Sequence, residues 1–244
     1  MKDTKETKEA KEMKRINGNS ENTESAFFSA KETKLTFQQE FDNAIRFAKQ
    51  AIEDEEKERD KIVILDYVLS VVKEDLKTDL LSYILYNKEN FSRELSSPFP
   101  LFYTDKNGNK NKVPESGIKT IDLKSDCVLV LPWYRERLYK QIRNLFYHYF
   151  TYDRRNHCAY YFPYFELCYA SNGTHSVSAG VVYKKGTILA TQYDITVLFP
   201  HVHTDGASWY NSHNGETAGE LDDFRLGIIY ELAKLKYEIE NNLN

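Results

Sequence analysis

Long apolar runs are missing from this chain of 244 residues. A helix that crosses a bilayer needs about 20 consecutive, mostly apolar residues, and no stretch of the sequence has them. The first residues are rich in Lys and Glu and lack the apolar core of a secretory signal. We therefore expect a cytoplasmic protein without a membrane partner.

Cysteine is also scarce, and its three positions (Cys127, Cys158 and Cys168) show no C-x-x-C spacing. This pattern argues against a disulfide framework and against a zinc ribbon. The net charge of −4 does not suggest a general nucleic-acid binder. Residues 133–155 depart from this balance, because they hold two acids and the following basic residues: Arg135, Arg137, Lys140, Arg143, Arg154 and Arg155.

Apolar residues recur with helical spacing from about residue 36 to residue 85. One apolar stripe consists of Phe37, Phe41, Ile45, Ala48 and Ile52. A second has the same spacing and consists of Leu65, Val68, Val72 and Leu76, with Leu80, Leu81, Ile84 and Leu85 after it. The spacing predicts a helical hairpin or a three-helix layer.

The second half of the chain alternates between strand-like and helix-like segments. We predict strands over 118–123, 127–131, 165–170 and 187–198, and helices over 133–150, from near Thr174 to 184, and over 216–243. Residues 200–214 are expected to form a polar loop. The fold class is α+β with an α/β-like C-terminal half, in which a helical layer precedes a small mixed sheet and a long C-terminal helix closes the fold.

Four segments follow from these patterns. Residues 1–34 form a charged tail that is disordered or transiently helical. Residues 35–95 form the helical region, and residues 96–117 form a loop or hairpin linker with three prolines and a DKNGNK turn. Residues 118–244 form a mixed α/β domain that carries the expected site.

The stretch YASNGTHSVSAG, from Tyr169 to Gly180, is the strongest candidate for that site. Asn172 and Gly173 permit a sharp reversal after a strand. A helix that begins near Thr174 directs its first free amides into the corner, where they favour anions and phosphate above all. We predict that Asn172, Gly173, Thr174 and Ser176 bind phosphate. The alternative is a plain strand-to-helix connection with a helix cap.

Gly173-Thr174-His175-Ser176 resembles the turn of the ParB/sulfiredoxin-type fold, where Gly-x-x-Arg or Gly-x-His-Arg joins a strand to a helix. The resemblance covers Phe165 to Leu189 and implies a turn that holds the phosphate of a nucleotide. Ser176 stands where that family has its Arg, so the phosphate-binding cation must come from elsewhere, or the activity is lost.

Arg135 is our candidate for this cation. Its spacing places it on the apolar face of its helix, and the helix dipole disfavours a cation in the first turn. It therefore needs a partner, either a carboxylate or a bound anion.

The motifs PWYRERL, NHCAYYFPYFELCYASNGTHS and HVHTDG also resemble a bacterial family that is known only as a domain of unknown function. This resemblance covers most of residues 118–215 and implies no activity.

All six histidines lie between positions 148 and 213. Histidine is the usual acid, base or metal ligand at neutral pH, so His175, His201 and His203 are our candidates for proton transfer. His201, His203 and Asp205 are also candidates for a metal site, although loop histidines that only form hydrogen bonds are more common.

Three functions remain open at this point, and the sequence does not identify a cofactor. The first is a domain that binds nucleotide or nucleic-acid phosphate, with phosphoryl or phosphodiester chemistry at the corner. Its partner would contact Arg135, Arg137, Lys140 and Arg143, and the last three of these otherwise form a solvated face. The second is a non-catalytic interaction module whose N-terminal helices bind a protein. The third is a metal-dependent hydrolase that uses His201, His203 and Asp205.

Overall fold

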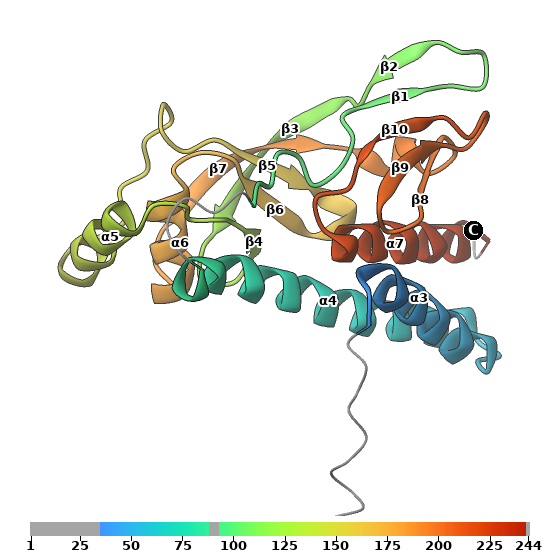
Figure 1. Ribbon diagram of the computed structural model, residues 1–244, viewed down its shortest axis with the longest axis horizontal. Helices are drawn as coiled ribbons and strands as arrows, with labels where there is room; N and C mark the ends of the chain where they lie inside the picture. The colour runs from blue at the N-terminus through green and yellow to red at the C-terminus, as the bar shows by residue number, and fades with distance from the viewer. Residues whose placement is uncertain (1–34, 88–92, 243–244) are drawn as a thin grey trace, which may run out of the picture. The chain divides into compact units, whose positions relative to one another are not determined.

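A five-stranded mixed sheet organises the fold in the computed structural model, which describes residues 35–87 and 93–242 (Figure 1). Its strand order is β3-β7-β5-β6-β4. The strands are β3 (Glu115–Asp122), β4 (Cys127–Leu129), β5 (Ala159–Phe162), β6 (Leu167–Ala170) and β7 (Thr187–Tyr193). β4 pairs with β6 in parallel, so the carboxyl ends of these two strands lie at the same edge of the sheet.

The two faces of this sheet contribute to two different hydrophobic clusters, because neighbouring residues of a strand point to opposite sides. Leu129, Leu167 and Tyr169 belong to the larger cluster, together with residues of the long helices. Val128 and Cys168 belong to the smaller cluster, together with Val177. The sheet is therefore buried on both faces around β4 and β6.

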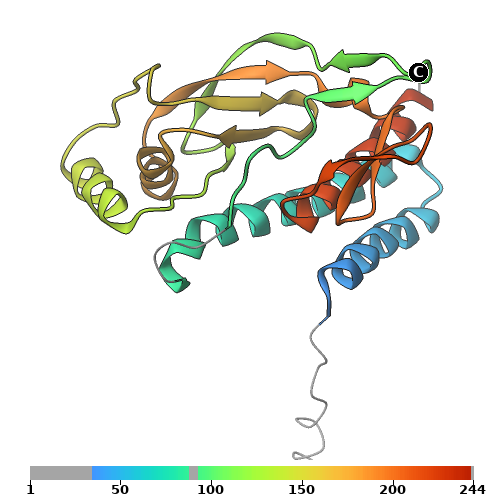
Figure 2. The same cartoon turned by 45° about the horizontal axis from the view of Figure 1, so that its top comes forward.

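The predicted helical layer consists of α3 (Phe37–Glu53) and α4 (Glu58–Tyr86), and the long C-terminal helix α7 (Phe224–Asn242) packs against both. α4 and α7 run along the same side of the sheet (Figure 2). Phe41, Ala48 and Ile52 of α3 are buried, as their spacing predicts. These elements confirm the α+β class and the closing helix.

Two shorter helices follow the parallel strands. α5 (Arg135–Tyr147) begins after β4, and α6 (Thr174–Tyr183) begins after β6, close to the start predicted from the Asn-Gly turn. The two helices pack against each other. The strand-turn-helix corner predicted from the sequence is confirmed.

Three predictions for residues 187–243 are wrong in part. The polar loop at 200–214 contains the hairpin of β8 (Val202–Thr204) and β9 (Ser208–Asn211), which joins β10 (Thr217–Glu220) in a three-stranded sheet. The carboxylate of Asp205 accepts hydrogen bonds from two amides of the turn, so polar residues form the hairpin instead of an open loop. The last helix begins at Phe224, after β10, and β7 ends before a 3₁₀ turn (η2, Ile195–Leu198).

The remaining elements are short. β1 (Phe102–Thr104) and β2 (Lys110–Lys112) form the surface hairpin expected around DKNGNK, and a 3₁₀ turn (η1, Pro163–Phe165) precedes β6. From Phe37 onward the chain forms one compact unit. The prediction for residues 1–34 lies outside the described residues. No helix in the described part of the chain has the length and apolar character to cross a bilayer.

Candidate functional site

A hollow of about 310 Å³ lies at the carboxyl ends of β4 and β6, and we call it the corner pocket. Open α/β sheets commonly bind ligands at this edge. All five residues of the predicted corner, 172–176, line the pocket. The other lining residues are Trp133, Arg137, Lys140, Gln141 and Asn156.

Gly173 is required at this corner for two reasons. It is the N-cap of α6 with a φ of 70°, which favours glycine. A Cβ atom at this position would also lie 2.3 Å from Cδ2 of His157 and 3.0 Å from the carbonyl oxygen of Asn156. Val177 donates the first hydrogen bond of α6, to the carbonyl of Gly173. The amides of Thr174, His175 and Ser176 therefore have no partner within the helix, as in any helix start.

His157 packs against the turn at Gly173 and contacts Ser176. Its Nδ1 accepts a hydrogen bond from the amide of Asp153, so the neutral ring carries its proton on Nε2. Nε2 lies 2.8 Å from Oγ of Ser176, and Ser176 in turn donates to the carbonyl of Gly173. A serine nucleophile needs a histidine nitrogen that accepts its proton. Because Nε2 carries the proton here, the arrangement is a structural support and not a nucleophilic pair.

His175 is held in its neutral form. Its Nε2 accepts a hydrogen bond from the amide of Tyr134, at 3.0 Å, and the residue as a whole is only 8% exposed. Burial, with a further contribution from Arg137, lowers its pKa to about 4. The proton therefore lies on Nδ1, which has no hydrogen-bond partner among the described residues and is not sealed from solvent. This geometry makes His175 a hydrogen-bond donor at neutral pH and favours binding over proton transfer.

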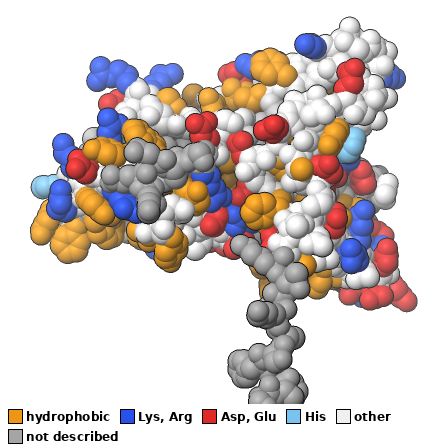
Figure 3. All heavy atoms as spheres, in the orientation of Figure 1, with side chains coloured by type: hydrophobic (Ala, Val, Ile, Leu, Met, Phe, Trp, Pro, Cys, Tyr) orange, Lys and Arg blue, Asp and Glu red, His pale blue; other side chains and the backbone are white. Residues whose placement is uncertain are grey.

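Arg137 and Lys140 bring positive charge to the corner pocket. They are exposed on α5 with the i, i+3 spacing of residues on one side of a helix, and Gln141 continues that side. Lys and Arg side chains lie among hydrophobic ones over α5 (Figure 3). Within the described residues neither cation pairs with a carboxylate, whereas Arg93, Arg225 and Lys236 all do. The i, i+3, i+4 spacing of 137, 140 and 141 is the sequence signal that points to this side of α5.

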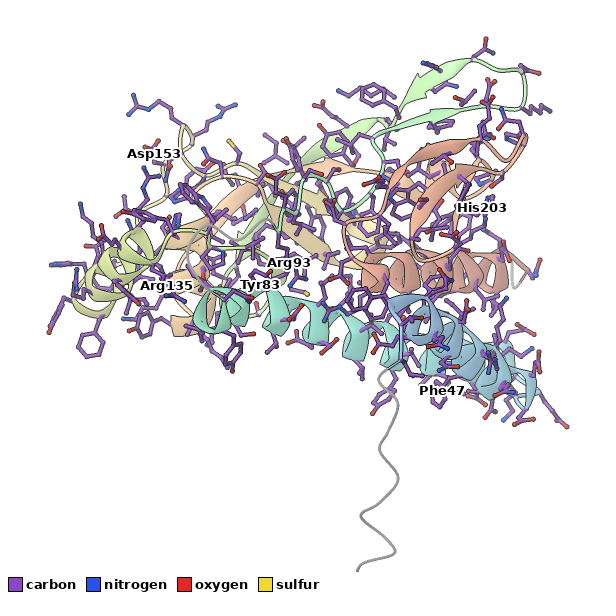
Figure 4. All side chains as sticks on the ribbon, in the orientation of Figure 1. Phe47, Tyr83, Arg93, Arg135, Asp153 and His203 are labelled. Atoms are coloured by element: carbon purple, nitrogen blue, oxygen red, sulfur yellow. The ribbon has the colours of Figure 1, made fainter. Side chains whose placement is uncertain are left out.

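Arg135 does not reach the corner pocket, so its prediction as the phosphate-binding cation is not supported by the structure. Its Nε donates to the carbonyl of Ile84, at 3.2 Å, and its Nη2 donates to the carbonyl of Asn87. Figure 4 shows Arg135 beside the end of α4. The last carbonyls of a helix lack donors within the helix and carry partial negative charge. The partner of Arg135 is therefore the end of α4 and not a core carboxylate.

The structure does not bring His201 or His203 to His175. Both lie around β8, which is well separated from α6 in both ribbon views (Figures 1 and 2). Nδ1 of His201 lies 2.8 Å from Nε2 of His213, and Nδ1 of His203 lies 3.2 Å from Oγ of Ser212. Asp205 forms the hairpin turn instead of facing them as a third ligand. In residues 35–87 and 93–242, no group of three or more His, Cys, Asp or Glu side chains could hold a metal ion.

Gln141 and Asn156 also line the corner, and no motif of the sequence points to a role for either of them. The sequence makes His157 a second candidate for a general base, beside Arg154 and Arg155, and gives no sign of its contact with Gly173. The contact between His157 and Gly173 links the segment before β5 to the start of α6. Hydrophobic periodicity in the sequence cannot reveal such a contact.

The fold and the corner define an α+β protein with a pocket at the carboxyl ends of two parallel strands. A model described as a family of unknown function (DUF6710) matches residues 7–243, so the chain belongs to this family. The predicted membership of a domain-of-unknown-function family is thereby confirmed. No curated protein and no solved structure matches the chain. The local likeness to the ParB/sulfiredoxin-type fold gains no support from these comparisons.

Proposed function

We propose that the corner pocket binds the phosphate group of a nucleotide or of a nucleic acid. The observation that carries the proposal is the gathering of four kinds of donor around one hollow. These are the first amides of α6, the neutral imidazole of His175, and the side chains of Arg137 and Lys140. Amides at a helix start bind anions, and an arginine or lysine adds charge and further donors.

The charge balance of the pocket supports an anionic ligand. Its lining contains two cations and no Asp or Glu, on a chain whose net charge is −4. A larger hollow of about 910 Å³ between α3, α4 and the start of α7 differs, because it is lined by five acids and two arginines. Those arginines already pair with Asp79 and Asp223. The corner pocket is therefore the better place for a phosphate.

The same geometry favours binding over catalysis. The hydroxyl of Ser176 donates to the backbone and faces a protonated nitrogen, so it is not activated as a nucleophile. His175 has a pKa of about 4 and carries its proton on Nδ1, so it is a poor base at neutral pH. We propose a phosphate-sensing or phosphate-holding role, without a chemical step by these residues.

Isothermal titration calorimetry with inorganic phosphate and pyrophosphate tests this proposal. We expect saturable binding to wild-type protein that weakens as salt is added. The double variant Arg137→Ala/Lys140→Ala should bind at least about tenfold more weakly, since each lost charge-assisted bond costs about 1.5 kcal/mol or more. Arg143→Ala is the control, because Arg143 is exposed on the same helix and does not line the pocket.

Two results would contradict the proposal: no binding of either anion to wild-type protein, or an equal loss in Arg143→Ala. Separate titrations with nucleoside monophosphates and with short single-stranded oligonucleotides distinguish the two sources of the phosphate.

We also propose a second function, a protein interface on the helical layer, which a separate observation favours. Val63, Tyr67 and Val71 are exposed on α4 at i, i+4 and i+8, and thus form one apolar stripe. Phe47 of α3 is exposed as well (Figure 4). Exposed apolar stripes of this kind are used for helix-to-helix contacts. Sedimentation velocity over a range of concentrations tests self-association through it. Tyr67→Lys should shift the protein to monomer, and a monomeric wild type would exclude a homodimer.

A further inference from the structure

A second hollow of about 410 Å³ adjoins the corner pocket, and we call it the side pocket. The two share three lining residues, Trp133, Asn172 and Thr174. Each volume falls within the range of about 300–1,000 Å³ that is typical of small-molecule sites. A ligand with its phosphate in the corner pocket can therefore extend across these three residues into the side pocket.

The walls of the side pocket suit a flat organic ring. Leu95, Leu131, Tyr169 and Ala170 supply apolar and aromatic surface. Trp133, which is 53% exposed, stands between the two hollows and offers indole surface to a ligand. Arg93, Glu94, Ser96 and Ser171 add charged and polar groups, so the lining is at least as polar as it is apolar. Such a mixed lining offers contacts to both the ring and the hydroxyl groups of a nucleoside.

The boundary between the hollows has polar groups to offer a ligand. The side chains of Asn172 and Thr174 form no hydrogen bond with any described residue. His175 is buried to more than nine-tenths beside them, and its Nδ1–H has no partner in the part of the chain that is described. This N–H is open to solvent at the corner pocket, so it can donate a hydrogen bond to a ligand there.

The far wall of the side pocket is fixed in place. The hydroxyl of Tyr169 donates to the carbonyl of Leu95, and both the amide and the hydroxyl of Ser96 donate to the carboxylate of Asp222. These bonds tie the segment that holds residues 95 and 96 to the sheet and to the start of α7. A preformed wall lowers the cost of ordering on binding.

A single nucleotide fits this arrangement better than a nucleic-acid strand. A strand-binding surface needs exposed aromatic residues along a basic track. Tyr139 and Phe146 are exposed on α5. However, they follow Arg137 by two and nine positions, which places both on the opposite side of the helix. Tyr147, the last residue of α5, is the only exposed aromatic residue of this helix on the side of Lys140, so the basic side carries no row of aromatic residues that leads into the corner pocket.

We propose that the ligand of the corner pocket is a mononucleotide whose nucleoside occupies the side pocket. This inference rests on the proposed function, since it assumes that the phosphate binds at the start of α6. Asn172 and Thr174 contact the part of the ligand that joins the two hollows, and Trp133 packs against its ring.

Calorimetry with inorganic phosphate and with the four ribonucleoside monophosphates separates the two proposals. We expect at least one nucleotide to bind wild-type protein tenfold or more tightly than phosphate does. Ser171→Trp fills the side pocket from an exposed position. It should reduce nucleotide affinity to that of phosphate and leave phosphate affinity unchanged. Ser171→Ala is the matched control, because it removes the hydroxyl without filling the hollow, and it should retain the preference.

Tryptophan fluorescence gives a second test that does not depend on Ser171→Trp. The chain has two tryptophans, and Trp209 is buried. The same nucleotide should change the emission of wild-type protein and not that of Trp133→Phe. Equal affinities for phosphate and nucleotides, with no change in Ser171→Trp, would overturn the side-pocket inference and leave the phosphate site standing. Tighter binding of an oligonucleotide that Ser171→Trp does not affect would also overturn it. Binding of neither phosphate nor nucleotide would overturn both proposals.

Discussion

Gly173 illustrates how one residue sets the geometry of the corner. It combines a positive φ with a contact surface that leaves no room for a side chain, since His157 and the carbonyl of Asn156 occupy the space. The backbone requirement is visible in the sequence as an Asn-Gly pair. The steric requirement is not, because it comes from a residue that the fold brings alongside.

Gly173→Ala should therefore lower the free energy of unfolding by more than the cost of placing an alanine in the left-handed backbone region. An L-residue in the left-handed region costs about 1–2 kcal/mol, and the contact with His157 adds to this. Gly215→Ala is a matched control, because Gly215 has a φ of 73° and no atom within 4 Å of a Cβ. Urea unfolding should show a loss at least about 1 kcal/mol larger for Gly173→Ala. Equal losses in the two variants would show that the His157 contact contributes nothing.

His175 gives the stability of the protein a pH dependence of known sign. Burial lowers its pKa from the ordinary 6.5 to about 4 in the folded protein. Between these values the unfolded chain binds a proton that the folded chain does not, so the free energy of unfolding falls as the pH is lowered. The contribution is complete above pH 6.5 and is lost as the pH falls toward 4. His157 acts in the same direction, since burial lowers its pKa as well.

The variant His175→Gln tests this dependence. The glutamine oxygen can accept the amide hydrogen of Tyr134 and does not titrate, so the slope of stability against pH between 6.5 and 4 should be shallower than in wild type. Urea unfolding at pH steps across this window gives the two slopes. Parallel slopes would mean that His175 is protonated in the folded protein.

Helix α5 is the element that decides which cation reaches the pocket. Arg135 and Arg137 lie two positions apart, which turns them to nearly opposite sides of a helix. Arg135 faces the end of α4, and Arg137 faces the start of α6. Spacing within α5 shows that the two arginines lie on different sides of the helix, but it does not show which side faces the pocket. That choice depends on how α5 packs against α6, so the sequence led to Arg135 and the structure to Arg137.

Arg135→Met should therefore affect stability and leave anion binding intact. The variant keeps the aliphatic part of the side chain and removes two hydrogen bonds to the carbonyls at the end of α4. Bonds to a charged donor contribute about 1.5–3 kcal/mol each at most, so we expect a loss of about 2 kcal/mol in urea unfolding. Phosphate affinity measured by calorimetry should stay within twofold of wild type. A tenfold loss of affinity would instead place Arg135 in the site.

At the scale of the whole molecule, charged residues join helices that are far apart in sequence. Arg225, at the start of α7, pairs with Asp75 and Asp79 of α4 and with Asp223. Arg93 bridges Asp79 and Asp223 as well. Burial alone raises the pKa of Asp79, but hydrogen bonds from Arg225 and Arg93 outweigh it and hold the pKa below its ordinary value.

Removing Arg225 should destabilise the whole fold. Arg225→Met leaves three carboxylates without one of their cations, and Asp223 is nearly buried. Breaking a buried pair from one side costs about 3–5 kcal/mol, so we expect about 3 kcal/mol here because Asp75 is exposed. Lys77→Met is the control, since Lys77 pairs with Glu74 within α4 and such pairs contribute about 0.5 kcal/mol. Thermal unfolding measures both losses. Similar decreases in the melting temperature of the two variants would show that the network does not hold α4 to α7.

The parts of this architecture that the sequence predicted are those with a local cause. The apolar stripes of α3 and α4 predicted the helical layer, and Asn172-Gly173 predicted the start of α6. The errors lie where short polar segments pair with each other. β8 and β10 have three and four residues, too few for alternation to be recognised, and they are strands only because β9 lies between them. The side pocket also has no local signal, because its walls come from three separate segments of the chain.

The close contact between Gly173 and His157 links the evolution of two positions. A larger residue at 173 is compatible with this turn only in a chain that has a smaller residue at 157, and loss of the imidazole also removes the partner of Ser176. Across the family, positions 157, 173 and 176 should therefore be substituted together rather than one at a time. Distant relatives with the same corner would be recognised by this triplet, even where the residues between its members have changed.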